Sequence, residues 1–87
     1  MKGKNYELHP HAQQRAKLRG VPSKWIDAVM AAPTQKLDGV LGWKVYQSKF
    51  FRGTKEVLLR AFVDERRNPK LVISVYITDR IAKYWSK

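Results

Sequence analysis

The 87-residue sequence contains no cysteine, few acidic residues and no long apolar run. Without cysteine, disulfide bonds, thiol catalysis and cysteine-ligated zinc sites are excluded. A membrane-spanning helix requires about 20 predominantly apolar residues in succession, and no segment approaches this length. The first residues are basic and lack the apolar segment of a secretory signal. We therefore expect a single domain over residues 1–87, located in the cytoplasm and without a membrane partner.

Basic residues dominate the charge of the chain. Eighteen Lys and Arg residues against seven Asp and Glu residues give a formal net charge of +11. A positive field of this strength attracts polyanions, of which nucleic acid is the commonest. The same charge also fits a protein partner with an acidic surface. Composition therefore favours a nucleic-acid ligand and leaves an acidic protein partner open.

The N-terminal third of the chain has the pattern of two short helices. Pro10 suits the first turn of a helix that Gly20 ends. Apolar residues then recur at helical spacing between Trp25 and Met30, and Pro33 ends this second segment. The sequence therefore predicts helices over 10–19 and from about 23 to 32, joined by a tight turn.

The rest of the chain alternates polar and apolar residues, as strands do. A short run at 34–37 is followed by alternating segments at 43–50, 56–64 and 71–78. Short connections make such strands antiparallel neighbours. The residues from 79 onward fit either a helical turn or an edge strand. The expected fold is α+β, with two helices packed on one face of an antiparallel sheet of about four strands.

Each alternating strand would place its apolar residues on one face and its polar residues on the other. We expect the helices to cover the apolar face and to leave the polar face open to solvent. The polar side chains of that face suit the binding of a phosphate backbone. The candidate residues on it are Lys44, Tyr46, Arg60, Ser74, Tyr76 and Thr78.

Three basic residues form a stripe on the expected first helix. His11, Arg15 and Arg19 are spaced four apart, so they share one side of the helix. The first turn of a helix disfavours imidazolium, and a neutral histidine can act as a general base. The two arginines would bind phosphate beside it. The alternative is a solvated basic stripe without a function.

Arg60 is an unusual charge because it lies in the middle of an apolar strand. One interpretation is a phosphate clamp that stabilises a transition state. The other is a guanidinium that reaches solvent and pairs with Asp64, on the same face of the strand. His9 and His11 have no cysteine or carboxylate cluster beside them, so neither a metal site nor a cofactor is predicted.

The expected first helix resembles the opening of a family of small bacterial domains. The shared motif is His-Ala, an Arg, and then Arg-Gly with an aliphatic residue, here His11-Ala12, Arg15 and Arg19-Gly20-Val21. That family is similar to the RelE-like and BrnT-like toxins and to the colicin-type and CdiA C-terminal ribonucleases. The resemblance implies two helices on a four-stranded antiparallel sheet and metal-independent cleavage of RNA, either tRNA or mRNA. It also implies an inhibitor, either an antitoxin or an immunity protein.

The leading hypothesis from the sequence is therefore a ribonuclease toxin controlled by an acidic antitoxin or immunity protein. His11 would act as base or acid when an RNA 2′-hydroxyl attacks the adjacent phosphate. Arg60 would stabilise the charge of the transition state, and Tyr76 would orient the phosphate. By the resemblance, Arg15 and Arg19 match the motif arginines and would bind substrate. The rival hypothesis is a non-catalytic module that binds nucleic acid or an acidic protein.

Overall fold

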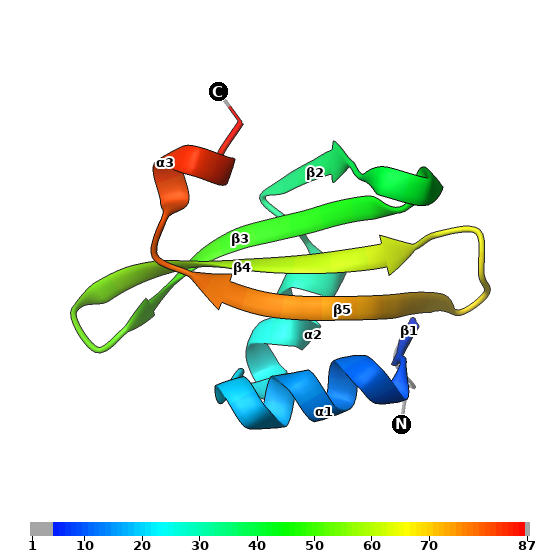
Figure 1. Cartoon of the computed structure of the whole chain (residues 1–87), viewed down its shortest axis with the longest axis horizontal. Helices are drawn as coiled ribbons and strands as arrows, with labels where there is room; N and C mark the ends of the chain where they lie inside the picture. The colour runs from blue at the N-terminus through cyan, green and yellow to red at the C-terminus, as the bar shows by residue number, and fades with distance from the viewer. Residues whose placement is uncertain (1–4, 87) are drawn as a thin grey trace.

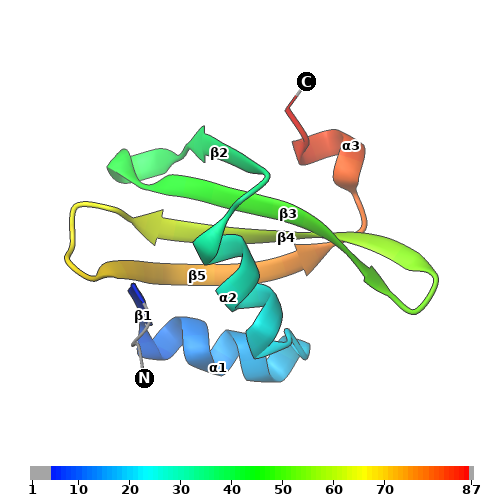
Figure 2. The same cartoon turned by 180° about the vertical axis from the view of Figure 1, so that it is seen from behind.

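A computed structural model describes residues 5–86, which form a five-stranded sheet with two helices on one face (Figures 1 and 2). The elements are, in order, β1 (Tyr6–Leu8), α1 (Pro10–Arg19), α2 (Ser23–Ala31), β2 (Gln35–Asp38), the 3-10 turn η1 (Val40–Gly42), β3 (Lys44–Arg52), β4 (Lys55–Asp64), β5 (Lys70–Thr78) and α3 (Ile81–Tyr84). No helix among these residues is long and apolar enough to cross a membrane.

The sheet has the strand order β1-β5-β4-β3-β2. Strands β2 to β5 form an antiparallel meander, whereas β1 pairs with β5 in parallel. The predicted α+β class and the two N-terminal helices are present. The sheet is mixed and has five strands, instead of an antiparallel sheet of about four, because the three-residue β1 joins its edge.

The first helix begins at Pro10 and ends at Gly20, as the sequence predicts. Gly20 adopts a left-handed conformation with φ 65°, and its N–H reaches the carbonyl oxygens of Ala16 and Lys17. The buried residues of α1 are Ala12 and Ala16, whose small side chains let the helix lie close to the sheet. The rest of its surface is largely exposed.

The second helix supplies most of the apolar packing on this face. Ile26, Val29 and Met30 of α2 are buried in the core. Trp25 stacks on Phe50 of β3, with ring centroids 4.6 Å apart and planes inclined by 10°. Figure 2 shows α2 crossing in front of the central strands, so this face of the sheet is covered.

The opposite face of the sheet is covered in part by the C-terminal segment. Of the two predicted possibilities for this segment, the helical turn forms, as α3. The carbonyl oxygen of Tyr84 in α3 accepts a hydrogen bond of 3.1 Å from Nε2 of Gln47 in β3. We call the sheet face that carries Gln47 and Arg60 the open face, because α1 and α2 lie on the other side.

Candidate nucleic-acid interface

Arg60 lies at the centre of the open face. It stands in cross-strand register with Gln47 of β3 and Tyr76 of β5. Its Nε donates a hydrogen bond of 3.0 Å to Oε1 of Gln47, and its Nη1 donates one of 2.7 Å to the hydroxyl of Tyr76. The guanidinium carbon is 4.2 Å from the ring centroid of Tyr84. Neighbours from β3, β5 and α3 thus hold the guanidinium in one orientation.

The groups that hold Arg60 are neutral. Asp64, the partner that the alternative interpretation requires, instead accepts a hydrogen bond of 2.9 Å from Nε of Arg66. Within residues 5–86, no carboxylate forms an ion pair with Arg60. A guanidinium has five N–H donors, and the described contacts use two of them. The remaining donors and the uncompensated charge suit a phosphate oxygen.

Gln47 connects Arg60 to the C-terminal segment. It is fully buried, and its Nε2 donates to Oε1 of Gln35 at 2.7 Å as well as to the carbonyl of Tyr84. Gln35 in turn accepts a hydrogen bond of 3.0 Å from the backbone N–H of Ser86. This network keeps α3 beside Arg60. The sequence analysis missed Gln47, although it follows Trp43 and Val45 at the two-residue spacing of one strand face.

Three aromatic rings surround the Arg60 guanidinium. The rings of Phe62 and Tyr76 stack at a centroid distance of 6.2 Å, and Tyr84 meets Tyr76 edge-on at 6.3 Å. The hydroxyl of Tyr76, together with the charges of Lys83 and Arg60, holds the pKa of Tyr84 below its usual value. A hydrogen bond and nearby cations favour the phenolate. Tyr84 therefore gives up its proton more readily than an isolated tyrosine does.

Four of the predicted residues share the open face. Tyr76 lies opposite Arg60, Ser74 lies opposite Phe62, and Thr78 lies one row further toward the β3–β4 turn. The hydroxyl oxygen of Thr78 accepts a hydrogen bond of 3.1 Å from the backbone N–H of Arg80. Ser74 and Thr78 are half-buried, so both remain accessible beside the Arg60 cluster.

The expectation that Lys44 and Tyr46 lie on the open face is wrong, because they pair with Val63 and Ala61, whose side chains lie in the core under the helices. Tyr46 pairs with Ala61, lies on the helix-covered face and is only 1% exposed. Its ring packs in the core, and its hydroxyl donates to Glu65 at the edge of that core. Lys44 forms an ion pair with Asp38 of β2. An amphipathic tyrosine can serve either face of a strand, and here it takes the buried one.

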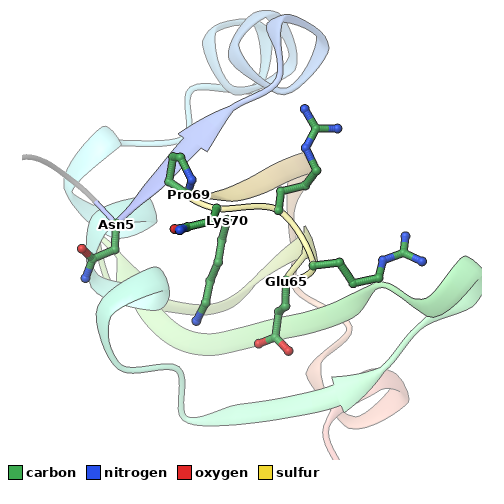
Figure 3. A pocket seen from close by; sticks show the side chains of 7 residues that line it. Asn5, Glu65, Pro69 and Lys70 are labelled. Atoms are coloured by element: carbon green, nitrogen blue, oxygen red, sulfur yellow. The ribbon is translucent and has the colours of Figure 1, made fainter.

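Tyr46 belongs to a second polar group, beside the turn between β4 and β5, together with Glu65 and Lys70, which are labelled in Figure 3. Its hydroxyl also accepts a hydrogen bond of 3.1 Å from Lys70, while Lys36 pairs with Glu65 at 2.6 Å. Burial and the Glu65 carboxylate raise the pKa of Tyr46, whereas Lys36 and Tyr46 lower the pKa of Glu65. A hollow of about 660 Å³ adjoins this group. Its lining residues are Asn5, Glu65, Arg66, Arg67, Asn68, Pro69 and Lys70.

His11 does not meet Arg60, because the sheet lies between them. The residue next to it, Ala12, packs in the same core as Ala61, on the helix-covered face. Arg60 neighbours Ala61 along β4 and therefore points to the other face. The predicted site that combined His11 with Arg60 is not formed.

The basic stripe of α1 stays on the helix-covered side of the molecule. Arg15 is half-buried, and Arg19 is exposed at the end of the helix. The side chain of His11 is exposed, and its backbone N–H is capped by Nδ1 of His9 at 3.0 Å. Arg15 and Arg19 are therefore not part of the Arg60 cluster.

No family model, curated protein or solved structure matches this chain. Within residues 5–86, no group of three or more His, Asp or Glu side chains is placed to hold a metal ion. A function must therefore be inferred from the chemistry of the Arg60 cluster itself.

Proposed function

We propose that this protein binds RNA on its open face and cleaves it without a metal ion, with Arg60 as the phosphate-binding residue. The observation that carries the proposal is the Arg60 guanidinium, held by Gln47, Tyr76 and Tyr84 and left without a carboxylate partner among the described residues. A preorganised cation that faces solvent is suited to the charge that develops on a phosphate during cleavage. The net charge of +11 supports a polyanionic substrate.

The proposed reaction uses Tyr84 as the base in place of histidine. The Tyr84 phenolate takes the proton of an RNA 2′-hydroxyl, and the 2′-oxygen attacks the adjacent phosphorus. Arg60 stabilises the negative charge of the pentacoordinate state. The bond from phosphorus to the 5′-oxygen then breaks, and Lys83, whose ammonium lies 5.3 Å from the Tyr84 ring centroid, donates a proton to the leaving oxygen. The products are a 2′,3′-cyclic phosphate and a free 5′-hydroxyl.

The biological role that we propose is that of a ribonuclease toxin acting in the cytoplasm on tRNA or mRNA. The resemblance of the α1 motif to toxin-like domains supports this role, as does the pairing of two helices with an antiparallel β2–β5 meander. An acidic antitoxin or immunity protein would then neutralise the basic open face.

The test is incubation of the purified protein with total RNA and with tRNA in the presence of EDTA. We expect cleavage with cyclic-phosphate ends, and a loss of about 100-fold or more in rate for Arg60→Ala. Arg19→Ala is the matched control, since it removes the same side chain from the exposed end of α1. His11→Ala should also cleave at the wild-type rate, because His11 lies across the sheet from Arg60.

Each other outcome identifies a different error. Cleavage that survives Arg60→Ala would show that the active site does not lie on the open face. Salt-sensitive RNA binding that depends on Arg60 but yields no product would establish the rival function, a non-catalytic RNA-binding module. If His11→Ala abolishes cleavage and Arg60→Ala does not, the active site lies on the helix-covered side.

A further inference from the structure

The β3–β4 hairpin projects beyond the rest of the sheet, at the left of Figure 1. Pairing of β5 with β4 ends at Thr78 and Leu58, and pairing of β2 with β3 ends at Gln47. Residues 50–52 and 55–57 pair only with each other. Within the part of the chain that the structure describes, neither edge of this ribbon carries another strand.

Phe51 lies in this ribbon on the same face as Arg60. The register of β3 with β4 is continuous, and Phe50 packs on Trp25 at the helix-covered face. Phe51 therefore points to the open face, where its side chain is 66% exposed. A single exposed apolar residue requires no ligand by itself. Because Phe51 lies on the face that carries Arg60, its ring can contact a ligand that is bound at Arg60.

The open face of β3 presents three side chains in line. Gln47 faces Arg60, Lys49 follows in the next row, and Phe51 in the row after that. At about 3.3 Å per residue, Phe51 is roughly 13 Å from Gln47 along the strand. The ammonium of Lys49, between them, lies 4.3 Å from the ring centroid of Trp85. Arg60, the ammonium of Lys49 and the ring of Phe51 therefore follow one another on the open face toward the β3–β4 turn.

The charges beside Phe51 favour a base over a phosphate at this position. Glu56 is its direct cross-strand neighbour and is exposed on the same face. A carboxylate repels a phosphate, whereas a neutral base can lie flat on a phenylalanine ring. Every nucleobase offers such a face, so this contact requires an unpaired base and no particular sequence.

We propose that Phe51 is a stacking platform for an unpaired base, so that the RNA taken by the open face is single-stranded near the cleaved bond. This inference rests on the proposed binding of RNA at Arg60. Stacking of one base on an aromatic side chain accounts for about a ten- to hundred-fold difference in affinity. Lys49 would contact the intervening backbone.

The experiment measures binding of a single-stranded 2′-O-methyl oligonucleotide, which lacks the attacking hydroxyl and is not cleaved. Phe51→Ala should weaken binding by about ten- to hundred-fold, and Phe51→Trp should retain it. Leu18→Ala is the matched control, because Leu18 is also a large apolar side chain, 75% exposed, on α1. Binding of a blunt RNA duplex should be equally weak in all of these proteins.

A fluorescent base provides a readout that a structural role would not change. 2-Aminopurine placed along the oligonucleotide should be quenched at one position by the wild-type protein and by Phe51→Trp, and not by Phe51→Ala. With a cleavable substrate, Phe51→Ala should raise KM and leave kcat unchanged, because uniform binding is lost.

Two results would overturn the inference while leaving the proposed function intact. The first is RNA binding that depends on Arg60 but shows equal affinity and quenching in Phe51→Ala. The second is a wild-type dimer, seen by sedimentation, that Phe51→Ala converts to a monomer without a change in RNA affinity. Absence of any RNA binding by the wild-type protein would instead reject the inference and the proposed function together.

Discussion

The hydroxyl of Tyr76 accepts a hydrogen bond of 2.7 Å from Nη1 of Arg60, the residue directly opposite it on β4. The proton of the same hydroxyl remains available to Tyr84, whose pKa is lowered chiefly by Tyr76. Arg60 therefore acts on Tyr84 through Tyr76 as well as through its own charge. The proposed phosphate-binding residue and the proposed base are linked by one hydroxyl group.

Removal of that hydroxyl should weaken the base. In Tyr76→Phe, the pKa of Tyr84 should rise toward its ordinary value, because its largest stabilising contact is lost. The rate of RNA cleavage should then fall at neutral pH, and the pH–rate profile should move to higher pH. NMR titration of the tyrosine rings measures the first effect. Ser74→Ala, which removes a hydroxyl from the same face of β5, is the control and should leave Tyr84 unchanged.

Gln47 should matter for both stability and RNA binding. Gln47→Ala removes the acceptor of Arg60 Nε and the donor to the Tyr84 carbonyl, so buried polar groups lose their partners. We expect the free energy of unfolding to fall by about 1–3 kcal/mol and RNA affinity to fall with it. Urea denaturation and a binding titration measure the two effects. Gln14→Ala, at an exposed position of α1, is the control. Equal stability of the two variants would contradict the hydrogen-bond network of Gln47.

Glu65 should make the protein lose stability in acid. Its pKa lies below the ordinary value of 4.5, first because of Lys36 and then because of Tyr46. A lowered folded-state pKa contributes stability above the unfolded pKa, and this contribution is lost as the pH falls through the folded value. Glu65→Gln should therefore destabilise the protein at pH 7, and the difference from wild type should shrink below about pH 4.

Urea denaturation of Glu65→Gln and wild type across this pH range measures the difference. Glu56→Gln, an exposed change in the hairpin, should differ little from wild type throughout. A Glu65→Gln effect of constant size from pH 7 to pH 3 would contradict the assigned ionic contacts.

Phe50 and Phe51 should respond in opposite ways, although they are neighbours. Phe50→Ala removes the ring that stacks on Trp25 and should lower the free energy of unfolding by about 2–4 kcal/mol. Its folded fraction should bind single-stranded RNA as the wild type does. Phe51→Ala should leave stability nearly unchanged, since its ring is exposed. Thermal unfolding and RNA binding, measured on both variants, separate the two effects. If Phe51→Ala lowers stability as much as Phe50→Ala does, the ring of Phe51 lies in the core.

The sequence predicted the elements that depend on local patterns. Pro10 and Gly20 define the ends of α1, and alternation defines β3, β4 and β5. The strand β1 has three residues, too few for a pattern, and forms only because β5 lies beside it. Local pattern therefore specifies elements whose hydrogen bonds or alternation lie within the segment itself.

The site was only partly predictable, for a different reason. Alternation placed Arg60 and Tyr76 on the polar faces of their strands. Their direct pairing was not predictable, because a register shift between Phe62 and Val63 lies between the β4–β5 turn and this pair. Alternation does not say which of the two faces is buried, so Tyr46 was assigned to the wrong side. Helical spacing likewise does not say which face of the sheet a helix covers, and so His11 was joined to residues that lie across the sheet.

The placement of β5 has a consequence for the chain while it is being synthesised. The first strand and the first helix both pack mainly against β5, so their main docking surface is absent until residues 70–78 exist. The same late segment brings Tyr76 to Arg60, and α3 then brings Tyr84. A chain that ends before β5 lacks two of the three residues that hold the Arg60 guanidinium, Tyr76 and Tyr84. Translation of the last fifth of the domain is thus the step at which both the core and the open face come into being.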